Sequence, residues 1–248
     1  METKKFIKLH KRSPAKILLF DIEATGLRAD FGFMLTFSWK LLGDKSAKVS
    51  TVLDHAHGRY VNDKLLVWKA YQVMKEADIW VGWYSSRFDV QFVQTRLLKH
   101  YGIAMPPVPQ VDGWWIARTK LRLHSNRLAS VQQFLELPTA KTPLKPEHWV
   151  KGAQGHPASV KYIAEHNLAD VECLEQAYLQ LRPLITNHPS VNIAAGDSDG
   201  CPCCGSPKFH KVREKWNRIT YAPLYRCHDC GAWSQGKMQK INGAFELR

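Results

Sequence analysis

The chain has 248 residues and a formal net charge of +13, and 45% of its residues are hydrophobic. These values exclude an intrinsically disordered chain and allow one well-buried domain with a small appendage. No apolar run approaches the roughly 20 residues that span a bilayer, and the basic start lacks a signal peptide's apolar segment, so we expect a cytoplasmic protein without membrane association. The excess of Lys and Arg predicts a polyanionic partner, most often nucleic acid.

The first strong structural signal is the apolar run Ile17–Phe20, which predicts a fully buried strand. Phe33–Leu42 and Lys48–Leu53 predict two more strands, with a polar turn between them. Three consecutive strands that pair antiparallel leave the first strand free to lie at the centre of a sheet. Residues 1–14 are expected to form a basic arm ahead of this domain.

Helical and strand patterns alternate further along the chain. The sequence predicts helices at 62–77, 89–101, 126–137 and 158–181, a short strand at 78–82, and a strand that turns into a helix at 111–123. Prolines and glycines in residues 138–157 predict a long irregular loop. Together these elements predict an α/β fold in which helices cover both faces of a mixed sheet.

Two carboxylates follow the first apolar run. Asp21 and Glu23 are two residues apart, so on a strand they project from the same face. Adjacent carboxylates repel each other unless a cation lies between them, and oxygen ligands suit Mg²⁺ or Mn²⁺. The alternative is that the strand has already ended and both acids are solvated loop residues.

Other acidic residues have ordinary explanations when each is taken alone. Asp89 lies at a strand-to-helix junction, where Asp is a common helix N-cap. His166 and Asp170 are four residues apart on the last long helix and so share a face, as an exposed ion pair would.

Taken together, these motifs resemble the DEDD superfamily of 3′–5′ exonucleases, whose members have an RNase H-like sheet. The resemblance rests on Phe20-Asp21-Ile22-Glu23, on the segment from Gly82 to Asp89, and on a His four residues before Asp170. It covers about residues 15–183, and its spacing is most similar to the proofreading exonuclease domains of family B DNA polymerases. It implies an RNase H-like mixed sheet flanked by helices over residues 15–186.

The resemblance also implies roles for individual residues. Four carboxylates would hold two Mg²⁺ or Mn²⁺ ions: Asp21, Glu23, Asp89 and Asp170. In two-metal hydrolysis, one ion lowers the pKa of the attacking water and the other stabilises the leaving 3′ oxygen. Thr25 and Leu27 match positions that contact the terminal nucleotide, and Phe88 would pack beneath the site.

Two positions depart from the family pattern. In the second motif, Gly82 to Asp89, Tyr84 stands where the family normally has an Asn. This departure leaves open how the protein would hold the terminal nucleotides. His166 stands where some members have a Tyr, whereas members with a His carry it one residue earlier. One residue is about 100° of rotation on a helix, so we expect His166 to take the Tyr-like role of orienting the water. An unperturbed pKa near 6.5 would also suit a base, and a merely packed His166 would leave activity weak or absent.

Five of the six cysteines lie after residue 200, in two Cys-x-x-Cys-Gly motifs. This spacing predicts a zinc ribbon in residues 201–248 with one structural Zn²⁺ and four thiolate ligands: Cys201, Cys204, Cys227 and Cys230. Cys203 would break the spacing, so we do not expect it to be a ligand. Residues 187–200 have the composition of a linker.

Basic residues alternate with aromatic residues between the two cysteine motifs. Arg213, Lys215 and Trp216 are expected to contact phosphates and to stack on bases. The alternatives are a purely structural ribbon and a ribbon that docks onto a protein partner.

The sequence therefore predicts a metal-dependent 3′–5′ exonuclease that acts on nucleic acid, DNA being favoured, with the zinc ribbon assisting binding. The alternatives are an RNase H-like structure-specific endonuclease and a catalytically silent nucleic-acid-binding adaptor. Any proofreading role would require a polymerase or another replication or repair protein as a separate partner.

Overall fold

The computed structural model describes residues 13–54, 61–138, 143–197 and 199–240. They form two compact units, one of which is Ala15–Tyr178, while the other comprises Ser13, Pro14 and the described residues from Leu179 onward. The predicted basic arm falls outside the described residues except for Ser13 and Pro14. Within the described ranges, no helix combines the length and apolarity that a membrane crossing requires.

The larger unit is built on a five-stranded sheet with the order β3-β2-β1-β4-β5. Its strands are β1 (Ile17–Ala24), β2 (Met34–Leu41), β3 (Lys48–Thr51), β4 (Ile79–Gly82) and β5 (Gln110–Asp112). The first strand pairs antiparallel with β2 and parallel with β4, and β2 pairs antiparallel with β3. The sheet is therefore mixed, with the first strand at its centre, as the sequence predicts.

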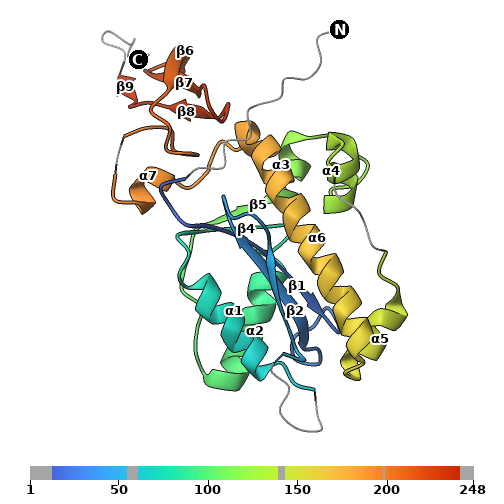
Figure 1. The fold of residues 1–248 in the computed structure, drawn as a ribbon. Coiled ribbons are helices and arrows are strands. Elements are labelled where there is room, and N and C mark those ends of the chain that lie inside the picture. The colour runs from blue at the N-terminus through green and yellow to red at the C-terminus, as the bar shows by residue number, and fades with distance from the viewer. Residues whose placement is uncertain (1–12, 55–60, 139–142, 198, 241–248) are drawn as a thin grey trace. The chain divides into compact units, whose positions relative to one another are not determined.

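Helices cover this sheet on both sides. Figure 1 shows α1 and α2 on one side of the sheet and the long helix α6 on the other. The helices of the larger unit are α1 (Lys64–Met74), α2 (Asp89–Tyr101), α3 (Gly113–Lys120), α4 (Leu128–Leu135), α5 (Pro146–Ala153) and α6 (Pro157–Leu181), whose last residues enter the second unit.

The central strand β1 has two faces with different partners. Leu18, Phe20 and Ile22 belong to the main hydrophobic core together with apolar residues of α1 and α2. Because side chains alternate along a strand, Asp21 and Glu23 project from the opposite face, toward α6. The apolar run is buried along its whole length because helices cover both faces of the sheet.

The loop predicted over residues 138–157 is wrong for Pro146–Ala153, which form helix α5. Its proline occupies the first turn, where a missing N–H costs no helical hydrogen bond. Trp149 packs against the hydrophobic core, and this tertiary contact stabilises a helix that is too short to be stable alone.

A buried ion-pair network joins the start of β2 to α1 and α2. Asp63 is fully buried and accepts hydrogen bonds from the backbone N–H of Met34 and from Arg96 Nε and Nη2, at 2.9, 2.8 and 2.6 Å. His100 Nε2 lies 2.8 Å from the same carboxylate. Arg96 also donates to the Ala29 carbonyl, so the network holds the segment that follows β1.

Removing the carboxylate of this network should strongly destabilise the protein. Asp63→Ala leaves the guanidinium of Arg96 buried without its partner, which typically costs about 3–5 kcal/mol of unfolding free energy. Urea unfolding followed by circular dichroism measures this cost. Asp44→Ala is the matched control, because Asp44 forms an exposed ion pair with Lys48 and should cost less than about 1 kcal/mol. Equal losses of unfolding free energy in Asp63→Ala and Asp44→Ala would contradict the role of Asp63 as the partner of a buried charge.

The smaller unit contains a four-stranded sheet in which β7 pairs antiparallel with every other strand. Its strands are β6 (Phe209–Trp216), β7 (Thr220–Cys227), β8 (Trp233–Gln235) and β9 (Gln239–Lys240). Every residue of β6 is exposed, so this strand buries little apolar surface. Ahead of the sheet lie a 3-10 turn at Arg182–Leu184 and the short helix α7 (Val191–Ala194), which falls in the predicted linker.

Candidate active site and cysteine cluster

The first two carboxylates lie on the central strand. Because β1 continues to Ala24, the alternative that Asp21 and Glu23 are solvated loop residues is wrong. Burial raises the pKa of Asp21 well above its usual range, and the nearby carboxylates of Asp89, Asp170 and Glu23 raise it further. The ionised form of Asp21 is therefore disfavoured, and a positive group in the site would stabilise it.

Asp89 enters the site from the β4-to-α2 junction. It is the first residue of α2 and is buried, and Phe88 holds the N-cap position. Its Oδ1 accepts a hydrogen bond of 3.0 Å from the backbone N–H of Ile22, so this carboxylate is fixed directly to the central strand. Burial raises the pKa of Asp89 to about 7, although the Ile22 hydrogen bond opposes the shift.

Helix α6 supplies an imidazole and a further carboxylate. His166 Nε2 lies 3.2 Å from Asp170 Oδ2 and 3.9 Å from Glu23 Oε1. Burial raises the pKa of Glu23 to about 7, while the Trp149 hydrogen bond and His166 lower it and Asp170 raises it. One ligand atom from each of Glu23, His166 and Asp170 lies within 4.8 Å of the others, so α6 and β1 build one cluster.

Two further residues hold the carboxylates on β1. Asn167 is fully buried, and its Nδ2 donates to Asp21 while its Oδ1 accepts from the Thr36 hydroxyl at 3.0 Å. Trp149 Nε1 donates to Glu23 Oε2 at 3.0 Å. Neither residue was predicted from the sequence. Trp149 was placed in a loop, and the position of Asn167 beside His166 was the only signal available for it.

A family model described as the RNase H superfamily matches residues 18–181. The chain belongs to the RNase H superfamily. A family B DNA polymerase from the hyperthermophilic archaeon Pyrobaculum calidifontis is similar in fold, with a TM-score of 0.51 and 14% sequence identity. The match covers 83% of this chain and 31% of the polymerase chain, so this chain spans less than a third of that protein. Comparison with curated protein sequences found no match.

The RNase H-like fold brings together carboxylates whose negative charges repel one another. Asp89 is buried and Asp21 and Glu23 are half-buried beside it, and all three have raised pKa values because little water reaches them and other carboxylates lie nearby. Such a set of oxygen donors fits hard divalent cations such as Mg²⁺ and Mn²⁺, which would neutralise the charge that burial disfavours. The residues present therefore suit the metal that the sequence predicts.

A hollow of about 730 Å³ opens beside the cluster and is bordered by Glu23. Thr25, Leu27 and Phe88 line it as well, together with Trp149 of α5. The side chain of Leu27 is 84% exposed, and Thr25 Oγ1 accepts a hydrogen bond from the Phe33 backbone N–H. Thr25 and Leu27, which the resemblance assigned to the terminal nucleotide, thus border one space with Phe88, which it placed beneath the site.

Tyr84 lies away from that space, with its ring edge-on to Trp114. Its φ of 64° is in the left-handed region, which Asn adopts far more readily than an aromatic residue does. Asp112 fixes this turn by accepting hydrogen bonds from the backbone N–H groups of Tyr84, Ser86 and Trp114. Asp112 was not predicted from the sequence, and Tyr84 is not among the residues that border the hollow beside Glu23.

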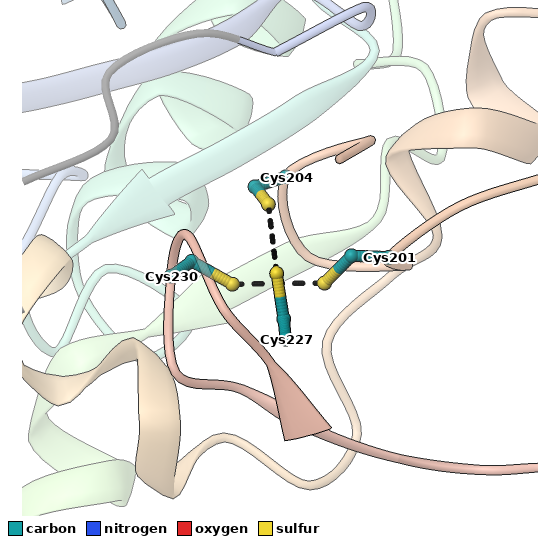
Figure 2. A group of neighbouring side chains, drawn as sticks. All are labelled: Cys201, Cys204, Cys227 and Cys230. Carbon is teal, nitrogen blue, oxygen red and sulfur yellow. Dashed lines mark hydrogen bonds between the residues drawn. The ribbon is translucent and has the colours of Figure 1, made fainter. Parts of the chain in front are cut away.

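The four cysteines converge in the smaller unit, as Figure 2 shows. The Sγ atoms of Cys201 and Cys230 are 3.6 Å apart, and those of Cys204 and Cys227 are 3.7 Å apart. Four sulfurs at the Zn–S distance of about 2.3 Å in a tetrahedron would be about 3.8 Å apart, so the cluster could hold zinc. Cys203 is buried nearby but is not part of the converging set.

The glycine after each motif has the backbone that a tight turn requires. Gly205 and Gly231 have φ values of 77° and 71°, and their N–H groups donate to the Cys201 and Cys227 carbonyls. Arg213, Lys215 and Trp216 lie on the exposed strand β6. Asn192 of α7 donates to the Cys201 carbonyl, so the predicted linker packs against the first motif.

The raised pKa values predict how pH and metal affect stability. Without divalent cations, the folded protein keeps protons on Glu23 and Asp89 up to about pH 7, whereas the unfolded chain releases them near pH 4. The free energy of unfolding should therefore fall as pH rises between these values and level off above them. Bound Mn²⁺ would replace those protons, so we expect it to raise Tm more at about pH 8 than at about pH 5.5.

Differential scanning fluorimetry of the protein with and without Mn²⁺ measures this dependence. Asp21→Asn is the matched control, because it removes one charge from the cluster and should reduce the increment at the higher pH. An increment that is the same at both pH values would show that the carboxylates do not bind the ion.

Proposed function

We propose that this protein is a metal-dependent 3′–5′ exonuclease that removes nucleoside monophosphates from nucleic acid, DNA being favoured. The observation that carries the proposal is the convergence of four carboxylates and one imidazole from β1, α2 and α6. Membership of the RNase H superfamily supports a nuclease, and the buried like charges support metal dependence.

In this proposal, the metal ligands are Asp21, Glu23, Asp89 and Asp170. Two Mg²⁺ or Mn²⁺ ions would activate water and stabilise the leaving 3′ oxygen when bound. Trp149 and Asn167 orient the oxygens of Glu23 and Asp21 by hydrogen bonds before any ligand arrives. Such partners commonly determine metal affinity as strongly as the ligands themselves do.

The surroundings of His166 support a role in handling the attacking water. Its Nε2 faces Glu23 and Asp170, so a water at the cluster lies within its reach. We assign it to orient this water and to accept its proton at Nε2. The contact with two site carboxylates argues against a residue that is merely packed.

The hollow beside Glu23 supports attack on a chain end. Its volume of about 730 Å³ is within the range of about 300–1,000 Å³ that small-molecule sites show, so it suits a single nucleoside. A second hollow of about 430 Å³ shares Leu27 and Phe88 with the first and is bordered by Arg28 and Arg87. These arginines would contact the phosphates on the 5′ side of the terminal nucleotide.

In the smaller unit, the four converging cysteines would hold one structural Zn²⁺. A module of this size buries too little apolar surface to fold without such a cross-link. Arg213, Lys215 and Trp216 would then add contacts to nucleic acid on the exposed strand.

The deciding experiment uses 5′-labelled single-stranded and duplex DNA and RNA with Mg²⁺ or Mn²⁺. The wild type should shorten the strand stepwise from its 3′ end, and Asp21→Asn should lower the rate by about a hundredfold or more. Internal cuts that the variant abolishes would replace the exonuclease with an endonuclease. Binding without cleavage by the wild type would leave only a nucleic-acid-binding adaptor.

Trp149→Phe should slow cleavage about tenfold near neutral pH, because it removes the hydrogen bond that orients Glu23 and lowers its pKa. The deficit should shrink as pH rises, since Glu23 then ionises without this donor. Rate profiles against pH for the wild type and the variant test this. Trp115→Phe is the control, because Trp115 is a partly exposed residue of α3. A rate deficit of Trp149→Phe that stays constant with pH would indicate that Trp149 acts through packing alone and not through the pKa of Glu23.

A further inference from the structure

The hairpin of β6 and β7 presents two faces of different chemistry. Cross-strand partners in an antiparallel sheet share a face, and the register pairs Trp216 with Tyr221 and Lys211 with Tyr225. A bulge between Lys211 and Arg213 keeps these pairs on one side. We call this side the aromatic face, and its aromatic members are Phe209, Trp216, Tyr221 and Tyr225.

The opposite side of the same hairpin is basic. Arg213 pairs with Leu224 and Lys215 pairs with Ala222, so both cations project away from the aromatic face. We call this side the basic face, and its cationic members are Arg213, Lys215, Arg226 and Lys240. Arg226 also lies 5.8 Å from the centroid of the Trp233 ring.

The aromatic face remains accessible although its rings touch one another. Trp216 is 76% exposed and Phe209 is 42% exposed. Phe209 and Tyr225 meet edge-on with their centroids 5.5 Å apart, and the Tyr221 hydroxyl donates to Gln239. These contacts hold Phe209, Tyr221 and Tyr225 in position, so a ligand that stacks on these rings would cost little of their side-chain freedom.

Exposed rings on a fully exposed strand add little to folding, and such apolar surface commonly marks an interaction site. The charge around them identifies the partner. Residues 201–240 contain eight Lys and Arg residues but only two acidic ones, Glu214 and Asp229. The partner must therefore offer flat apolar faces together with negative charge. Unpaired nucleic acid has both, whereas a duplex hides its base faces in the stack.

We infer that the aromatic face is a stacking platform for the unpaired bases of single-stranded nucleic acid, and that the basic face contacts phosphates regardless of bases. The inference rests on the proposed function in taking nucleic acid as the substrate, and it names single strands as the form that this unit holds. Stacking contributes about 1–3 kcal/mol per base, and phosphate contacts give binding that weakens with salt.

The test measures binding by the full-length Asp21→Asn protein with zinc present and no Mg²⁺ or Mn²⁺ added. The probes are a fluorescein-labelled thymidine oligonucleotide of about 20 residues and an abasic oligonucleotide of equal length, because a site of this kind covers about 4–16 nucleotides. Adding Trp216→Ala should weaken binding to the thymidine strand about tenfold and leave binding to the abasic strand unchanged. Trp216→Phe should retain most of the affinity, since it keeps a stacking ring.

Paired changes on the basic face provide the matched comparison. Arg213→Gln with Lys215→Gln should weaken binding to both probes equally and reduce the slope of log Kd against log salt by about 1.4. Zinc content and the thermal transition of each variant verify that the ribbon is folded. Loss of affinity for both probes in folded Trp216→Ala would overturn the inference.

An unchanged affinity of Trp216→Ala for both probes would also overturn it and leave the aromatic face for a protein partner. The result is separate from that of the cleavage assay, because the measurement needs no catalysis. Stacking without cleavage by the wild type would refute the exonuclease while supporting the platform. Cleavage with no distinction between the two probes would refute the platform alone.

Discussion

The fold depends on holding several carboxylates together against their mutual repulsion. Asp89 is buried, Asp21 and Glu23 are half-buried close to it, and the pKa values of all three are raised as a result. Burial of like charges destabilises a protein unless other groups or a cation compensate. The compensation comes from neutral donors, namely the backbone N–H of Ile22, the amide of Asn167 and the indole of Trp149. These donors fix the oxygens in place but leave the net charge for a ligand to neutralise.

The central strand β1 makes this arrangement possible because one of its faces carries apolar side chains and the other carries the acids. Leu18, Phe20 and Ile22 bury apolar surface against α1 and α2, which offsets the cost of burying acids on the other face. Pairing with β2 and β4 on both sides satisfies the strand's backbone and removes its freedom to move. The site is therefore built on the most constrained element of the domain, as a site that needs fixed geometry requires.

The smaller unit has little apolar burial, and its four cysteines are what could stabilise it. Its β6 is exposed along its whole length, so apolar burial cannot be what holds the hairpin. The four converging sulfurs lie at the base of the hairpin, where one metal ion could cross-link both loops. Stability obtained from a few buried cysteines leaves both faces of the hairpin free to carry aromatic and basic side chains. If the aromatic side chains of the hairpin formed a hydrophobic core instead, they would be buried and could not contact a ligand.

The sequence by itself determined whatever depends on short spacings. The alternation along β1 fixed the common face of Asp21 and Glu23, and the cysteine motifs predicted the converging thiols, because neighbours on a strand or in a tight turn have few possible arrangements. Tertiary structure alone decided which distant residues complete the site. Trp149 lies in a segment that the sequence predicts as a loop but that forms a helix when it packs against the domain. The role of Asn167 depends on the packing of α6 against the sheet, which brings its side chain to Asp21. Contacts across more than a hundred residues leave no local period in a sequence, so only the folded chain reveals them.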